Sequence, residues 1–241
     1  MVKVSKALFL GVTLTASTMG AAMATTLTFD FGTIGADGGA VCGSNCVIAG
    51  QTSHNFTVSG NTVVATGYST GHTDGTAPSG VAFVTQKPGP FGQETGLGES
   101  DTLSPPSDPD YEIGPGKALV ADNTNLVNNG FTPSTVSIGS LQGPDTVDIF
   151  TGPSLGSLTL LDTVAGSTDP QTFNLPANAV FVELVGVPQR DVSGINNNTL
   201  LVEEVFTSTP RVPEPASLAI LGTALVGFGL VRRQRRPTAN I

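Results

Sequence analysis

Between residues 25 and 211, short runs in which apolar and polar residues alternate recur along the chain. The runs lie at residues 27–31, 56–58, 63–65, 81–83, 136–141, 147–150, 158–164, 173–175, 179–187 and 200–206. Successive side chains of a β-strand point to opposite faces, so this alternation predicts strands with one buried face. No stretch of this segment shows apolar residues at helical spacing, and the chain's 30 Gly and 17 Pro disfavour helices.

These runs predict an all-β fold, either an antiparallel β-sandwich or a jelly roll of about nine or ten short strands. One hairpin can be placed, because residues 56–58 and 63–65 flank Ser59-Gly60-Asn61, a plausible turn. The alternation does not give the strand order, so both architectures remain open.

The N-terminus has the pattern of an export signal. Lys3 and Lys6 precede an apolar stretch at residues 7–14, and Ala22-Met23-Ala24 fits an A-x-A cleavage site. Residues 1–24 are therefore predicted to be a signal peptide, which a signal peptidase removes.

The C-terminus has three parts in sequence. Its first part is an extended segment that two prolines hold out of the α region: Val212, Pro213, Glu214 and Pro215. An uncharged apolar run follows at residues 216–231, and as a helix it would measure about 24 Å, slightly short of a ~30 Å hydrocarbon core. Four arginines that would stop translocation come last: Arg232, Arg233, Arg235 and Arg236. We therefore expect a transmembrane helix here.

The order Pro-Glu-Pro, apolar helix and arginine cluster resembles the PEP-CTERM sorting signal of Gram-negative bacteria. The resemblance implies that an exosortase, a membrane-embedded cysteine protease, recognises residues 212–241 and removes them. It also implies export across the inner membrane to the cell surface or beyond, in hosts that typically make exopolysaccharide or biofilm matrix. The alternative is a single-pass protein whose anchor is never removed. The exported part, or passenger, would then be residues 25–211.

The passenger is strongly acidic. Of the chain's 19 acidic residues only Glu214 lies outside it, and of the 10 basic residues only Lys87, Lys117, Arg190 and Arg211 lie inside, which leaves a formal charge of −14. A nucleic-acid partner is excluded on this ground, because phosphate binding needs a basic patch. Cations and neutral polysaccharide are compatible partners.

Residues 86–118 are rich in Pro and Gly and hold six acids, which predicts a long surface loop. Asp108, Asp110 and Glu112 alternate, so in an extended segment they would share one face and could converge on Ca²⁺. A solvated acidic loop without metal is the alternative, and the spacing does not match an EF-hand. The stretch from Gly96-Leu97-Gly98 to Ile113 also resembles a loop in other PEP-CTERM passengers.

Cys42 and Cys46 are the chain's two cysteines. In an exported protein they are predicted to form a disulfide that closes a very small loop. A zinc site would need two more ligands, with His54 the nearest imidazole, and a redox pair would normally be C-x-x-C.

Catalytic motifs are missing from the sequence: it has no G-x-S-x-G, no H-E-x-x-H and no phosphate-binding loop. His54 and His72 lie in polar stretches and are predicted to be loop or surface residues. The chain has no Trp, and Tyr111, inside the acidic segment, is the one aromatic residue to test for glycan stacking, with simple loop packing as the alternative. We therefore predict a non-catalytic structural or adhesive surface protein without a required cofactor, with a secreted polysaccharide or peptide hydrolase as the alternative.

Overall fold

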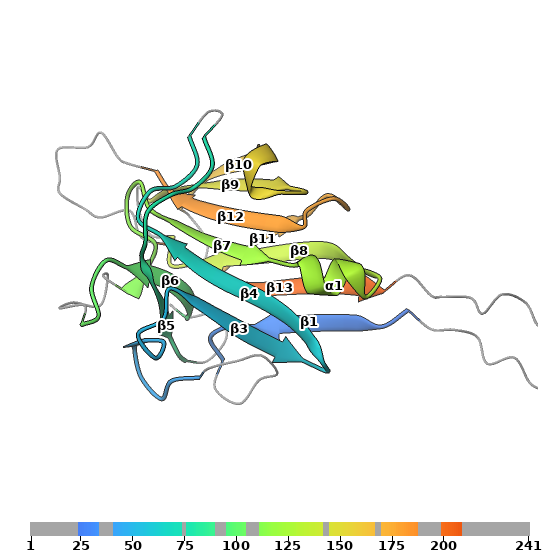
Figure 1. Cartoon of the computed structure of the whole chain (residues 1–241), viewed down its shortest axis with the longest axis horizontal. Coiled ribbons are helices and arrows are strands. Elements are labelled where there is room, and N and C mark those ends of the chain that lie inside the picture. The colour runs from blue at the N-terminus through green and yellow to red at the C-terminus, as the bar shows by residue number, and fades with distance from the viewer. Residues whose placement is uncertain are drawn as a thin grey trace, which may run out of the picture. The chain divides into compact units, whose positions relative to one another are not determined.

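Two antiparallel β-sheets face each other across one apolar core (Figure 1). This computed structural model describes residues 24–33, 41–73, 76–89, 95–104, 111–141, 145–166, 170–187 and 199–208. They belong to one compact unit, Ala24–Thr209. The prediction of an all-β antiparallel sandwich is confirmed.

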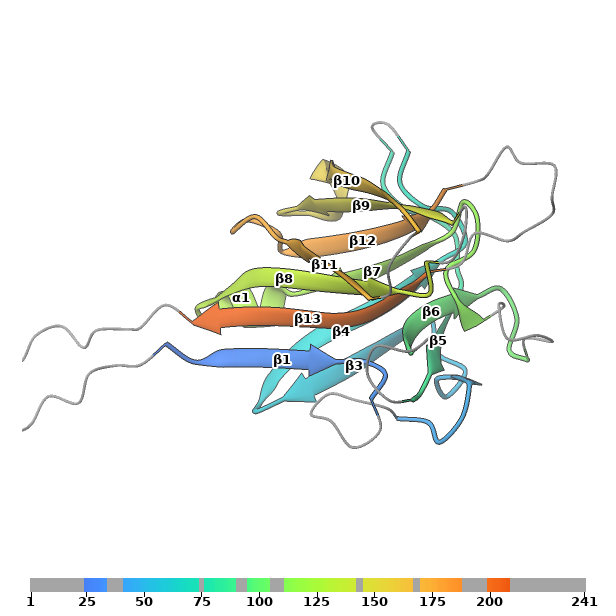
Figure 2. The same ribbon diagram turned by 180° about the vertical axis from the view of Figure 1, so that it is seen from behind.

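The six-stranded sheet has the order β10-β9-β12-β7-β4-β3 and lies nearer the viewer in Figure 1. Its strands are β3 (Ser53–Val58), β4 (Asn61–Tyr68), β7 (Ala118–Asp122), β9 (Thr146–Gly152), β10 (Thr159–Ala165) and β12 (Phe181–Gly186). The seven-stranded sheet has the order β11-β8-β13-β6-β5-β2, and β1 also pairs with β13 (Figure 2). Its strands are β1 (Thr26–Asp30), β2 (Cys46–Val47), β5 (Phe83–Lys87), β6 (Gly96–Ser100), β8 (Phe131–Gly139), β11 (Gln171–Asn174) and β13 (Leu200–Ser208).

The hairpin predicted around residue 60 is present as β3 and β4. Phe56 lies opposite Val63, and Val58 lies opposite Asn61, so the turn itself is Ser59-Gly60. Both turn residues have positive φ, 49° and 79°. This is the backbone of a type I′ turn, whose twist matches that of the two strands.

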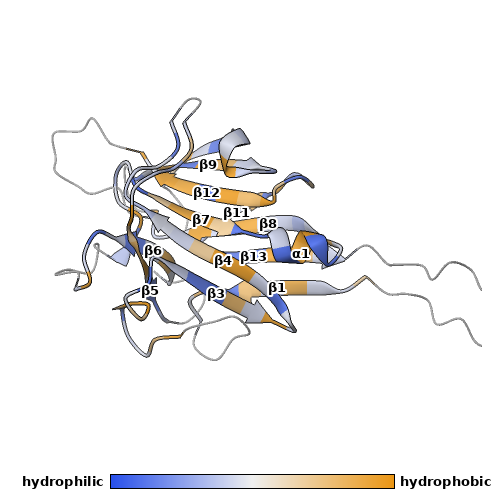
Figure 3. Ribbon diagram, in the orientation of Figure 1, coloured by the Kyte–Doolittle hydropathy of each residue, from blue (hydrophilic) through white to orange (hydrophobic). Residues whose placement is uncertain are grey.

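The core lies between the inner faces of the sheets. Its largest completely buried side chains include Phe29, Phe31 and Phe206 from the seven-stranded sheet, and Leu119 and Leu184 from the six-stranded sheet. The apolar character is plainest along β7 and β12, which lie in the middle of the six-stranded sheet (Figure 3). The alternation in the sequence therefore marks the faces that pack together.

One polar contact crosses this core. Glu204 of β13 lies level with Phe29 and Val136, both completely buried, and its own side chain is also completely buried. Asn123, directly after β7, donates from Nδ2 to Glu204 Oε1 over 3.2 Å. Burial raises the pKa of Glu204 to about 8, against the smaller opposing effect of the Asn123 hydrogen bond. The sandwich thus stabilises the protonated form of a carboxyl group in its interior.

The prediction of a long surface loop at residues 86–118 is wrong. Strand β6 lies inside this segment, between β13 and β5, and every residue of β6 is buried. Its glycines made it look like a loop, but they are needed for close packing. A Cβ on Gly98 would lie 2.3 Å from the carbonyl oxygen of Tyr111, because residues 111–113 cross directly over the strand. Glu99 and Glu112 are buried here, not solvated.

The first and last strands of the passenger lie side by side. Strand β1 pairs with β13 in antiparallel register from Thr26 opposite Thr207 to Asp30 opposite Glu203. The backbone N–H of Thr25 donates to Ser208 Oγ over 2.8 Å, and the N–H of Ser208 donates to the carbonyl of Thr25, also over 2.8 Å. The passenger therefore begins and ends at the same end of the sandwich.

The expected signal peptide, Ala24 apart, and the expected transmembrane helix lie outside the described residues. The described part contains α1 (Thr124–Asn128) and the short 3-10 helix η2 (Leu155–Ser157). Neither of these two helices is long and apolar enough to cross a membrane.

The buried carboxyl groups predict that the protein loses stability as pH rises. Burial raises the pKa of Glu99 and Glu183 to about 7 and that of Glu204 to about 8, whereas an unfolded Glu titrates near 4.3. Between about pH 4.5 and 8 the folded state therefore holds more protons, and the free energy of unfolding falls. Glu204→Gln, which imitates the protonated form, is expected to raise the melting temperature at pH 8 and to change it little at pH 4.5.

Glu203→Gln is the matched control, because Glu203 is the neighbouring residue and is only partly buried. Its effect should be clearly smaller. A Glu204→Gln variant that melts below the wild type at pH 8 would contradict this account.

Candidate functional site

A short segment after β4 lies across the outer face of the six-stranded sheet. We call residues 70–73 the strap. The N–H of Gly71 donates to the carbonyl of Gly116 over 2.9 Å, and the N–H of His72 donates to Glu183 Oε1 over 2.8 Å. A Cβ on Gly71 would lie 2.5 Å from Val185 Cγ1, so the strap can approach the sheet this closely only because residue 71 is a glycine.

Beside the strap is a pocket of about 410 Å³, which we call the outer pocket. Its lining residues come from the strap, from the turn before β7 and from β9, β12 and the residue after β12: Thr70, Gly71, His72, Thr73, Gly116, Asp148, Phe150, Val185 and Val187. Phe150, Val185 and Val187 make an apolar floor. Threonines, an imidazole and a carboxylate supply the polar groups. This mixture suits a small ligand with apolar faces and several hydroxyl groups.

The outer pocket lies away from the end at which the passenger begins and ends. In the six-stranded sheet Phe181 lies level with Asp122, close to α1, whereas Val185 and Asp148 lie toward the opposite end. Figure 1 shows α1, the start of β1 and the end of β13 at one end of the sandwich. The strap follows the other end of β4.

Glu183 and His72 hold buried polar atoms that have no hydrogen-bond partner among the described residues. These atoms are Glu183 Oε2 and His72 Nδ1. Glu183 is completely buried, and that burial raises its pKa to about 7 despite the N–H of His72. The His72 ring packs on Phe150 with 4.7 Å between ring centroids. Unpaired buried polar groups are uncommon in folded proteins and cost stability. Atoms of this kind also occur elsewhere among the described residues, for example at Thr95 and Glu204.

The arrangement favours binding over hydrolysis. Asp148 is the one carboxylate among the described residues that line the pocket, and its Oδ1 accepts from Thr163 Oγ1 over 2.6 Å. Glu183 lies near it but is covered completely and does not line the pocket. Most glycosidases use two carboxyl groups that both reach the substrate.

Sequence reasoning missed this site. His72 was expected to be a loop or surface residue, and it does lie in a loop, but it is partly buried and its ring packs on Phe150. Asp148 and Glu183 fall on the outward positions of β9 and β12. The alternating pattern predicts those outward positions, but it cannot show that the strap, which is distant in sequence, covers Glu183.

The predicted calcium ligands are only partly described. Asp108 and Asp110 lie outside the described residues, which contain no group of three potential metal-ligating side chains. Glu112 is buried, with its Oε1 2.5 Å from Lys87 Nζ, and its Oε2 accepts from Ser140 Oγ over 2.9 Å. Both carboxylate oxygens therefore already have protein partners, and the calcium site stays a prediction.

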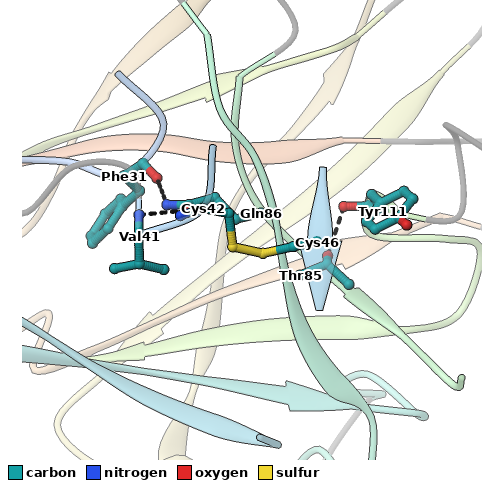
Figure 4. The surroundings of a disulfide bond; sticks show 7 residues. All are labelled: Phe31, Val41, Cys42, Cys46, Thr85, Gln86 and Tyr111. Atoms are coloured by element: carbon teal, nitrogen blue, oxygen red, sulfur yellow. Dashed lines mark hydrogen bonds between the residues drawn. A yellow bond between two sulfur atoms is a disulfide. The ribbon is translucent and has the colours of Figure 1, made fainter. Parts of the chain in front are cut away.

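Tyr111, considered above for glycan stacking or loop packing, is partly buried where residues 111–113 cross over β6. Its carbonyl oxygen accepts from Thr85 Oγ1 over 2.7 Å (Figure 4).

A second, more open hollow of about 490 Å³ lies near the start of β1 and includes Thr25, Val58 and Glu203 in its lining. It lies where the passenger begins and ends.

The predicted disulfide joins Cys42 and Cys46, with 6.3 Å between their Cα atoms. The adjacent Gln86 side chain makes three hydrogen bonds to nearby backbone (Figure 4). Its Nε2 donates to the carbonyl of Phe31, and its Oε1 accepts the N–H groups of Val41 and Cys42 over 2.8 and 3.2 Å. The disulfide loop thus covers β5 at the edge of its sheet, a structural role.

Comparison with known proteins gives one sequence match. Residues 211–236 match the family model described as the PEP-CTERM protein-sorting motif. No curated protein sequence matches the chain. The predicted sorting residues, 212–215 and the arginines at 232–236, fall inside the matched range, although the structure does not describe them.

Two solved structures of family 29 carbohydrate-binding modules show a weak likeness. One, a mutant used to probe ligand recognition, is 10% identical, with a TM-score of 0.26, over 78% of this chain and 89% of the module. The other is 8% identical, with a TM-score of 0.24, over 78% and 86%. At these scores the likeness decides nothing about this chain. The identification therefore rests on the C-terminus: the chain carries a PEP-CTERM protein-sorting motif, which implies export and exosortase-mediated sorting to the cell envelope or surface.

Proposed function

We propose that the protein is a cell-surface or extracellular-matrix component with a structural or adhesive role linked to exopolysaccharide. The observation that carries this proposal is the PEP-CTERM motif at residues 211–236, behind a passenger that folds as one sandwich. The formal charge of −14 on residues 25–211 keeps such a protein soluble outside the cell and disfavours binding to anionic surfaces. The disulfide suits an oxidising compartment.

The pairing of β1 with β13 supports this role. Because Thr25 and Ser208 are hydrogen-bonded to each other, both connections toward the membrane start from one end of the sandwich. Three residues separate Ser208 from Val212, so the four steps between them span at most about 14 Å when fully extended.

The alternative of a secreted hydrolase has less support. The outer pocket offers Asp148 as its one lining carboxylate among the described residues, and the nearby Glu183 is covered. The alternative of a permanent anchor differs from the main proposal only in whether the tail remains, and the mass of the native protein distinguishes them.

Processing can be tested on the native protein. We expect a surface or extracellular form that starts at Thr25 and lacks the arginine cluster, as shown by fractionation and intact-mass spectrometry. Replacing Pro213, Glu214 and Pro215 with alanine should leave the full tail on a membrane-bound product, because the protease loses its extended recognition segment. Pro210→Ala, just before the matched range, is the control and should be processed normally.

Three results would contradict the proposal in different parts. The full-length chain in the cytosol would refute export. An intact tail on all surface protein would refute cleavage and favour permanent anchoring. Turnover of a polysaccharide or peptide by the purified protein would favour the hydrolase.

We also propose that Asp108 and Asp110 bind Ca²⁺ weakly, with Glu112 contributing only if it leaves Lys87. If they do, millimolar Ca²⁺ should raise the melting temperature by about 3 °C or more, the effect of a ligand present well above its dissociation constant. The double variant Asp108→Asn, Asp110→Asn should lose this shift, whereas Asp162→Asn on β10 should keep it. A wild-type melting curve that is the same with calcium and with chelator would remove the idea.

A further inference from the structure

We propose that the outer pocket binds one ring of a neutral sugar. The inference deepens the proposed function, because it names the site and the chemical class through which a surface protein of this kind would contact a glycan. Sugar binding does not depend on the sorting tail, so the sugar-binding inference and the sorting proposal can fail independently.

The size and lining of the pocket carry the first step. A volume of about 410 Å³ lies within the usual range for small-molecule sites and exceeds what a single sugar ring occupies. Phe150, Val185 and Val187 give an apolar floor for the C–H face of the ring. Asp148, Thr70 and Thr73 bring a carboxylate and two hydroxyl groups to the same pocket, and these can hydrogen-bond to sugar hydroxyls.

Charge narrows the ligand class. Asp148 in the lining and a passenger charge of −14 disfavour uronic acids, phosphate esters and other anions. Asp148 can also pair with an ammonium group, so glucosamine is the probe that separates a charge-driven site from a neutral one. The two threonine hydroxyls and the apolar side chains of the lining favour a neutral polyhydroxylated ring.

The strap is attached to the sheet by several contacts. It is fixed by the bonds from Gly71 to Gly116 and from His72 to Glu183, and by the close approach of Gly71 to Val185. A wall fixed in advance lowers the entropy lost on binding. The fold also leaves Glu183 Oε2 and His72 Nδ1 buried without partners among the described residues, a loss of stability of the kind that functional sites carry.

The proposal is tested by measuring sugar binding directly. The full chain, in a detergent without a sugar headgroup, is titrated with glucose, galactose and N-acetylglucosamine, and with glucuronate and glucosamine as charged probes, while backbone amide resonances are followed by NMR. At least one neutral sugar should shift the amides of Gly71, His72 and Gly116 with a Kd of about 1–10 mM. Glucuronate should bind more weakly than every neutral sugar that binds.

Two variants test the contacts. Asp148→Asn removes the charge-assisted acceptor and should weaken binding about fivefold or more. His72→Phe keeps the ring on Phe150 and the backbone N–H to Glu183 but removes both ring nitrogens, and it should also weaken binding. Asp162→Asn, the same substitution on an exposed position of β10, should bind like the wild type.

The proposal is overturned if no neutral sugar shifts these amides up to about 50 mM. Shifts centred on Tyr111, tightest binding by glucuronate, or undiminished binding by both pocket variants would overturn it as well. So would hydrolysis of an oligosaccharide that stops in Asp148→Asn, because the site would then be catalytic. If the protein is exported and cleaved as expected but binds no sugar, this inference is refuted and the proposed surface role is not.

Discussion

The pairing between the first and last strands of the passenger is the constraint on which the sandwich depends. Strand β13 contacts β1, β8 and β6, so it lies at the centre of the seven-stranded sheet, yet it is the last strand of the chain to be made. The hydrogen bond from Thr25 to Ser208 spans 183 positions in sequence. Contacts of such separation form slowly. The sheet therefore cannot close until the chain has been made as far as β13.

Burial of carboxyl groups is the second constraint. The protein is acidic, but several of its acids lie inside: Glu204 crosses the core to Asn123, Glu112 pairs with Lys87, and Glu183 holds the strap. Each has a different partner and so a different consequence. Glu112 has a cation, whereas Glu204 and Glu183 favour the protonated state, which makes the fold more stable in mildly acid surroundings than in alkaline ones.

The alternating pattern predicted the sandwich, the hairpin at Ser59-Gly60 and most strands, because those elements bury one face and expose the other. It failed where both faces are covered. Strand β5 carries the buried polar residues Thr85, Gln86 and Lys87, and the glycines of β6 leave room for residues 111–113 to cross it. The outer pocket escaped prediction for a related reason: its strap is held by Gly116 and Glu183, which are distant in sequence, and no local pattern records such contacts.

The disulfide loop has a consequence for the edge of its sheet. Strand β2, the last strand on that side, has only two residues, and the disulfide-closed segment that leads into it is fastened to Gln86 of the neighbouring β5. An edge this short offers few free amide and carbonyl groups to another chain. A second copy of the protein is therefore less able to extend the sheet along this edge.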